Sequence, residues 1–165
     1  MVGEESRRER KITSNKAATR VGICPHNFNV SFPLGHGESW AYKSIDGSLI
    51  HNGERVAVGD TYGPGDTIGV LMSIASPHIH MNPSQPNEGS RVAFYKNGRL
   101  VHEQRPLKQL FYCFGVSLYN YSRVEVLPES EKRYLLHKEA RHYYSVVNEP
   151  ILYRDLQKNK LFKLS

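Results

Sequence analysis

The sequence is poor in the features that mark secreted, membrane-spanning and metal-bound proteins. Its 165 residues include only two cysteines, Cys24 and Cys113, which are too few for a disulfide framework or a cysteine-based metal site. No apolar run is long enough to cross a bilayer, and the opening residues, MVGEESRRERKITSNK, lack the apolar stretch of a secretory signal. We therefore interpret both cysteines as small buried hydrophobic residues on strands, in a reducing compartment such as cytosol or nucleus.

Motifs of catalysis are lacking too. There is no nucleophile elbow and no HExxH, and the glycines of YGPGDTIG are not followed by the Lys-Ser/Thr of a phosphate-binding loop. They favour a tight entry into a strand, with Asp66 accepting backbone hydrogen bonds. His78 and His80 form an HxH pair, but no Cys or carboxylate cluster nearby completes a zinc site. We expect no metal, no cofactor and no enzymatic activity.

The net charge of +6 is concentrated at the two ends of the chain. Residues 1–19 hold five basic and three acidic residues, and residues 129–165 hold eight and five. The middle, residues 20–128, is nearly balanced, with nine basic and eight acidic residues, so it is not a general polyanion-binding surface. Solvated basic tails are the favoured interpretation of the ends, and weak contact of these tails with nucleic acid is the alternative.

The middle of the chain has the pattern of β-strands. Short β-branched or alternating runs recur, namely RVGIC, SWAYKSI, SLIH, DTIGVLMSI, RVAFYKNGRLVHE and FYCFGVSLYNYSRVEVLP. Asn97-Gly98 predicts a tight hairpin turn, a second turn is expected near Asn120, and residues 75–90, with three prolines, are expected to be a loop. Because no helical period separates the runs, we predict an all-β fold, an antiparallel β-sandwich.

Both ends of the chain are expected to differ from this sandwich. Residues 1–19 are polar and charged, and we expect them to lack fixed structure. After Pro128, ESEKRYLLHKEARHYY has good helix formers, whereas the amphipathic SVVNEPILYRDLQKNKLFKL is interrupted by Pro150. We predict that residues 129–165 form an appendage with partly helical structure.

The ordered strand motifs resemble a SPRY domain, specifically that of the Ash-two family of scaffold subunits in SET/MLL (COMPASS-type) histone methyltransferase complexes. The resemblance covers about residues 18–128 and rests on ATRVGI, PLG, SWAYKS, YGPGDTIG, FYKNG and SLY, in this order. It implies a concanavalin-like sandwich with a non-catalytic role in the nucleus, in methylation of lysine four of histone H-three.

The family has several strands before its RxG motif. Here only nineteen residues precede Arg20, so the resemblance covers a partial domain (20–128), and we expect exposed strand edges and apolar faces.

The resemblance also implies a binding site. In the family, a basic pocket binds an acidic, phosphorylatable segment of a subunit like retinoblastoma-binding protein five. By motif position, this pocket would use Arg20 at the head of RxG, Pro33 of PLG, and Lys43, where the family more often has arginine. Arginine grips carboxylate or phosphate with two parallel hydrogen bonds, lysine adds a point charge, and proline gives a rigid wall. The alternative for Arg20 and for Lys43 is a strand-edge salt bridge, and for Pro33 an ordinary loop proline.

Further partners follow from the same resemblance. A SET-domain subunit would carry the catalysis, and a Dpy-thirty-type dimer would bind an apolar C-terminal helix. The candidate for that helix is YYSVVNEPILYRDL, although Pro150 interrupts it. Its apolar contacts would be Val146, Val147, Ile151 and Leu152. The rival functions are another SPRY adaptor, such as a substrate receptor of a ubiquitin ligase, and a basic protein that associates with nucleic acid.

Overall fold

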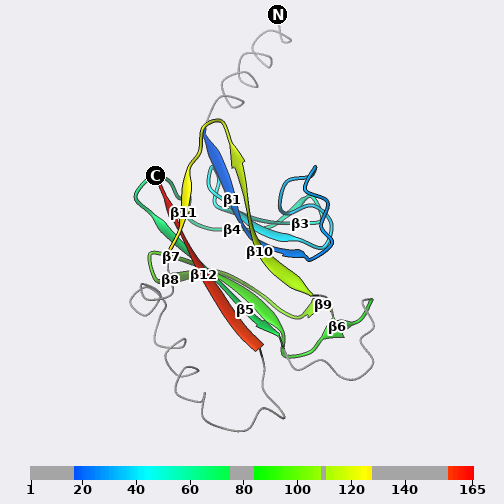
Figure 1. Ribbon diagram of the computed structural model, residues 1–165. Helices are drawn as coiled ribbons and strands as arrows, with labels where there is room; N and C mark the ends of the chain where they lie inside the picture. The colour runs from blue at the N-terminus through cyan, green and yellow to red at the C-terminus, as the bar shows by residue number, and fades with distance from the viewer. Residues whose placement is uncertain (1–16, 75–83, 109–110, 128–155) are drawn as a thin grey trace, which may run out of the picture.

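The computed structural model describes residues 17–74, 84–108, 111–127 and 156–165 (Figure 1). Its strands are β1 (Ala18–Pro25), β2 (Trp40–Lys43), β3 (Ser48–His51), β4 (Glu54–Val58), β5 (Thr67–Ile74), β6 (Pro86–Asn87), β7 (Arg91–Lys96), β8 (Arg99–Gln104), β9 (Leu107–Lys108), β10 (Tyr112–Tyr119), β11 (Val124–Val126) and β12 (Leu156–Leu164). All pairings between these strands are antiparallel, and none of the described residues is helical. The predicted all-β antiparallel fold is confirmed. Over the same residues, no helix has the length and apolar character needed to span a membrane.

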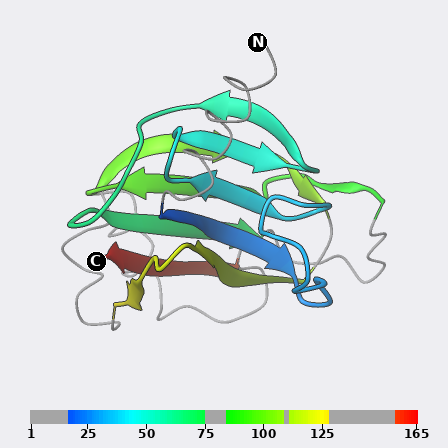
Figure 2. The same ribbon diagram turned by 90° about the horizontal axis from the view of Figure 1, so that it is seen from above.

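The strands form two five-stranded sheets (Figures 1 and 2). The first sheet has the order β10-β1-β2-β3-β4, and the second has the order β11-β12-β5-β7-β8. The small strands β6 and β9 pair with each other. The two large sheets enclose one apolar core, to which the first contributes Val21 and Tyr42 and the second Val70 and Phe94, all fully buried. The rings of Tyr42 and Phe94 meet across the core with centroids 6.0 Å apart.

The C-terminal strand β12 occupies an interior position in the second sheet. It pairs with β5 from Leu156 to Lys163 and with β11 on its other side. Phe162 and Leu164 face the core, while Leu161 packs on the opposite side of the sheet. The prediction of a partly helical appendage is therefore wrong for Leu156–Leu164. Its amphipathic pattern fits a helix or a strand, and the free edges of β5 and β11 select the strand.

The remainder of the predicted appendage lies outside the described residues. This applies to residues 129–155, which include the candidate partner helix except for its last residue, Leu156, where β12 begins. Val146, Val147, Ile151 and Leu152 are among them.

At the other end of the chain, β1 begins at Ala18, two residues before the expected boundary, because Thr19 is already buried and its N–H donates to Ser44 Oγ at 2.9 Å.

The predicted turns are confirmed. Asn97 and Gly98, with φ of 50° and 82°, join β7 to β8, and Asn120, with φ of 49°, lies in the turn after β10. Both residues of a two-residue hairpin turn need positive φ, which Asn and Gly tolerate. A second Asn-Gly pair, Asn52-Gly53, joins β3 to β4. Sequence analysis does not identify β4, although this turn signal marks it.

The entry into β5 has the predicted form. Asp66 accepts a hydrogen bond from the Gly63 N–H at 2.9 Å, and Gly65 has φ of 89°. Hydrogen bonds from Asn97 and Gly63, together with Lys96, outweigh the effect of partial burial and lower the pKa of the Asp66 carboxyl. The carboxylate therefore stays ionised and ties this turn to the β7–β8 hairpin.

Two expectations about single segments need correction. The stretch 75–90 includes the short strand β6, because Pro86 and Asn87 pair with β9, while residues 75–83, with His78 and His80, lie outside the described residues. Cys24 and Cys113 lie on strands directly opposite each other, but Cys24 is only half-buried and Cys113 is exposed. They face outward from the first sheet, Cys113 on the edge strand β10 and Cys24 on the neighbouring strand β1. Burial, and then the nearby Cys113, raise the pKa of Cys24.

Candidate partner-binding site

Arg20 and Lys43 lie opposite each other on neighbouring strands of the first sheet. Arg20 in β1 is in register with Lys43 in β2 and, on its other side, with Ser117 in β10. Residues opposite each other in an antiparallel pair share one face of the sheet. Because the adjacent residues Val21 and Tyr42 are buried in the core, Arg20, Lys43 and Ser117 form a row on the outer face of the sheet.

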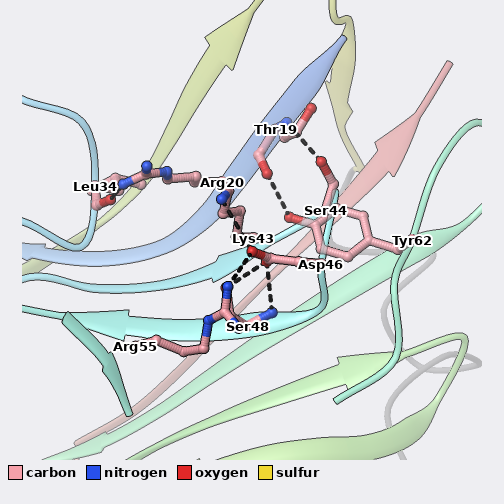
Figure 3. Close-up of polar contacts among 9 residues, drawn as sticks. All are labelled: Thr19, Arg20, Leu34, Lys43, Ser44, Asp46, Ser48, Arg55 and Tyr62. Atoms are coloured by element: carbon pink, nitrogen blue, oxygen red, sulfur yellow. Dashed lines mark hydrogen bonds and ion pairs between the residues drawn. The ribbon is translucent and has the colours of Figure 1, made fainter. Parts of the chain in front are cut away.

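The Arg20 side chain is held by neutral groups. Figure 3 shows it directed toward Leu34, and its Nη1 donates to the Leu34 carbonyl oxygen at 2.8 Å. Its Cζ lies 5.9 Å from the centre of the Tyr119 ring, within cation–π range. Its Nε is buried and has no hydrogen-bond partner among the described residues, and no described carboxylate forms an ion pair with it. The described part of the chain thus leaves the Arg20 charge without a counter-ion.

The loop between β1 and β2 folds back over β10 and brings Pro33 into the site. The Leu34 N–H donates to Ser117 Oγ at 2.9 Å. The Leu34 side chain is buried and lies over Gly115, where an added Cβ would come within 3.3 Å of it. Pro33 directly precedes Leu34 and is half-buried. The fold therefore places Pro33 next to the residue whose carbonyl oxygen binds Arg20.

Lys43 has a different environment from Arg20, because an acidic residue forms an ion pair with it. Its Nζ lies 3.1 Å from Asp46 Oδ2, and Arg55 Nη2 lies 3.1 Å from the same oxygen (Figure 3). Partial burial acts to raise the pKa of Asp46, but hydrogen bonds from Ser48, followed by Lys43, outweigh it and lower the pKa to about 2. Asp46 is therefore ionised at neutral pH and shares its charge between two cations.

A set of buried hydrogen bonds holds the register of β1 and β2. The Ser44 N–H donates to the Thr19 carbonyl oxygen at 2.9 Å, and the Thr19 N–H donates to Ser44 Oγ. From the core side, the Tyr62 hydroxyl donates to the Tyr42 carbonyl oxygen at 2.7 Å and lies 3.2 Å from that of Thr19. Burial, followed by the nearby Tyr42, raises the pKa of Tyr62 well above its usual value, so this donor persists at physiological pH. These bonds keep Arg20 opposite Lys43.

Sequence reasoning does not name two residues that shape the site, Asp46 and Arg55. Arg55 lies in β4, and the turn signal Asn52-Gly53 is the feature that locates this strand. No local signal specifies that Lys43 and Arg55 share one carboxylate, because this depends on how the β2–β3 turn lies beside β4.

The chemistry that this outer face supports is the binding of an anion. A guanidinium presents a planar set of donors that fits a carboxylate or a phosphate. Since Lys43 already pairs with Asp46 and Arg20 has no acidic partner among the described residues, Arg20 would supply the larger part of the attraction for such an anion. Within the described ranges, no group of three or more His, Cys, Asp and Glu residues is placed to hold a metal ion.

No protein-family model matches this chain, and a search of the curated proteins finds no match. The resemblance to the Ash-two SPRY domain therefore stays a prediction, and the function has to be argued from the geometry around Arg20.

Proposed function

We propose that this chain is a non-catalytic, SPRY-type binding module that docks an acidic segment of a partner protein on the outer face of its first sheet. The observation that carries the proposal is the Arg20 guanidinium, which is fixed by the Leu34 carbonyl oxygen at 2.8 Å and has no acidic partner among the described residues. A partly buried charge without a counter-ion is unfavourable. A carboxylate or phosphate from a partner would accept hydrogen bonds from Arg20 and offset this cost.

Pro33 and Lys43 would have supporting roles in this docking. Pro33, beside Leu34, would give the incoming segment a rigid apolar wall. Lys43 would add a second positive charge, reduced by its ion pair with Asp46 at 3.1 Å. The proposal thus assigns most of the binding free energy to Arg20 and a smaller share to Lys43.

The resemblance to the Ash-two family supports a place for this module in a nuclear COMPASS-type histone methyltransferase complex. There, the acidic segment would belong to a subunit like retinoblastoma-binding protein five, and the SET-domain subunit would carry out methyl transfer. This chain would position the partner and would need no cofactor. A Dpy-thirty-type dimer would bind the segment that contains Val146 and Ile151.

The test is a calorimetric titration of the full chain with a short peptide rich in Glu and Asp, with one serine either plain or phosphorylated. We expect saturable binding that Arg20→Ala weakens by about 1.5 kcal/mol or more, the cost of losing a charge-assisted contact. Arg20→Lys keeps the charge but loses the planar fork, so an intermediate loss is expected. Arg99→Ala is the matched control, because it removes an exposed arginine from the second sheet and should leave the affinity unchanged.

Two results would contradict the proposal. The first is the absence of binding by wild-type protein whose cooperative thermal unfolding shows that it is folded. The second is binding whose affinity falls equally in Arg20→Ala and Arg99→Ala and also falls as the salt concentration rises. Such binding would be general attraction to a basic chain, which salt screens. Thermal unfolding of each variant checks that the loss of the bond to Leu34 has not unfolded the site.

A further inference from the structure

Three of the four edge strands have features that discourage pairing with another strand. The edges are β4 and β10 in the first sheet and β8 and β11 in the second. β4 carries Glu54 and Arg55, β8 carries Arg99 and Glu103, and the pairing of each with its neighbour contains a register shift. β11 is only three residues long. Charges, irregular pairing and short length are the usual protections of a sheet edge.

The fourth edge, β10, has none of these protections. It is eight residues long, and its sequence, YCFGVSLY, contains no charged residue and no proline. Its pairing with β1 continues through eight consecutive residue pairs without a shift. On its other side, no strand of the described residues is hydrogen-bonded to it. β10 therefore presents the kind of edge to which an extended peptide adds as a new strand.

The backbone groups that face this free edge can be identified. The His26 N–H donates to the Phe111 carbonyl oxygen at 2.8 Å, and these two residues continue the register of β1 and β10. Hydrogen-bonded and non-hydrogen-bonded pairs alternate in an antiparallel ladder, so the odd-numbered residues of β10 bond to β1. The even-numbered residues direct their N–H and C=O groups to the free edge. They are Tyr112, Phe114, Val116 and Leu118.

Toward the end of β10, the inward-facing side chains are apolar and remain exposed. Val116 is opposite the fully buried Val21, so Val116 and Leu118 face the interior, yet they are 38% and 48% exposed. In β11, Val126 is opposite the core residue Phe162 and is 52% exposed. In the described part of the chain, the sandwich is thus open between β10 and β11. A strand joined to β10 would cover these side chains with its own inward-facing residues.

The outward-facing positions of the same edge lead to Arg20. Ser117 is in register with Arg20, and Tyr119 lies under its guanidinium at 5.9 Å. Arg20 donates a hydrogen bond to the Leu34 carbonyl oxygen, and the Leu34 N–H donates to Ser117 Oγ. The guanidinium therefore leans over β10. A strand added to β10 would lie about 5 Å beyond it, so an acidic side chain on its outward face would come within reach of Arg20.

We propose that β10 is a site of β-strand addition, at which a partner binds as an extended segment with alternating apolar and acidic residues. The apolar residues cover Val116, Leu118 and Val126, and an acidic residue on the other face binds Arg20. The charge of Arg20 and the apolar character of the opening select this occupant. The inference rests on the proposed docking of an acidic segment, and it adds the edge and the backbone hydrogen bonds by which that segment is held.

The first experiment uses the full chain and a peptide of alternating Val and Glu, matched to the eight residues of β10. Two further versions are N-methylated at alternate amides, one at the odd and one at the even positions. Because alternate residues of a strand point their N–H groups to opposite sides, we expect one methylated version to lose about tenfold or more in affinity and the other to bind like the parent. Equal binding by both versions, or equal loss, would overturn strand addition.

A pair of variants tests the same edge from the protein side. Leu118→Asp places a negative charge on the inward face of β10, where we expect it to weaken the peptide by about tenfold or more. Leu100→Asp is its control, because Leu100 lies in the opposite edge strand β8 and is 47% exposed, close to the 48% of Leu118. Unchanged affinity in Leu118→Asp, with thermal unfolding preserved, would overturn the proposal. The methylated peptides decide the question if this variant does not fold.

Amide hydrogen exchange distinguishes other occupants of the edge. In the free protein, the even-numbered amides of β10 should exchange faster than the odd-numbered ones, and the peptide should protect them. Protection of both sets without peptide would overturn the proposal. If this protection rises with protein concentration, a second copy of this chain covers β10. If the protection is independent of protein concentration, another part of the same chain covers β10.

The two proposals can fail separately. If the peptide binds and depends on Arg20, but both methylated versions bind alike, the acidic docking stands and strand addition is wrong. If the Val-Glu peptide shows the methylation difference but binds Arg20→Ala as tightly as the wild type, strand addition stands and acidic docking is wrong. If none of the peptides binds, both are wrong.

Discussion

Replacing Phe162 by alanine tests whether β12 is an integral strand of the sandwich. Phe162 is 3% exposed and packs in the core between the two sheets, in register with Ile68 of β5 and Val126 of β11. Removing a buried phenylalanine loses about 1.5–3 kcal/mol of transfer free energy. The cavity that remains raises the total to about 3–5 kcal/mol. If the C-terminal segment were a detached appendage, the same change would cost about 0.5 kcal/mol or less.

The assay is equilibrium unfolding in urea, followed by the fluorescence of the single Trp40, which is itself buried. With a slope of about 2 kcal/mol per molar urea, the midpoint should fall by roughly 1.5–2.5 M. Lys163→Ala is the matched control, because Lys163 is the exposed neighbour on the same strand, and its midpoint should barely change. A Phe162→Ala midpoint within error of the control would refute the placement of β12. If Phe162→Ala unfolds entirely, Phe162→Leu gives a smaller, measurable loss.

Two further predictions concern the first sheet. Asp46 has a pKa lowered to about 2 from its usual 3.8, so its contribution to stability is present above about pH 4 and is lost as the pH falls toward 2. The difference in unfolding free energy between wild type and Asp46→Asn should therefore shrink over that range, and a constant difference would contradict the assignment. In Gly22→Ala, the new Cβ would lie 1.8 Å from the Trp40 carbonyl oxygen on the paired strand β2, so we expect a loss of about 3 kcal/mol or more in urea unfolding. Gly63→Ala, whose Cβ meets nothing within 4 Å, is the control, and an equal effect of both changes would show that β1 and β2 are not so closely paired.

The local features of the fold could be predicted from the sequence because their causes are local. Continuous apolar runs mark β5 and β7, and both strands are buried on both faces. Asn97-Gly98 marks a turn because these residues tolerate the positive φ that the hairpin requires. For the candidate site, the family resemblance led to the prediction of Arg20 and Lys43, and the structure places these two residues in register. Their different surroundings, with Asp46 beside Lys43 and neutral groups around Arg20, could not be predicted in this way.

Which strands are neighbours was decided only by the tertiary structure. The segment Leu156–Leu164 is compatible with a helix or a strand, and it becomes β12 because β5 and β11 offer backbone partners on both sides. The unprotected edge of β10 likewise follows from strand order, since the same eight residues would be fully paired in the middle of a sheet. Backbone φ preferences and apolar runs belong to single residues and their immediate neighbours, so the sequence alone determined strands such as β5 and β7 and turns such as Asn97-Gly98. Strand order and the exposure of an edge depend on contacts between segments far apart in the chain, so only the folded structure could decide them.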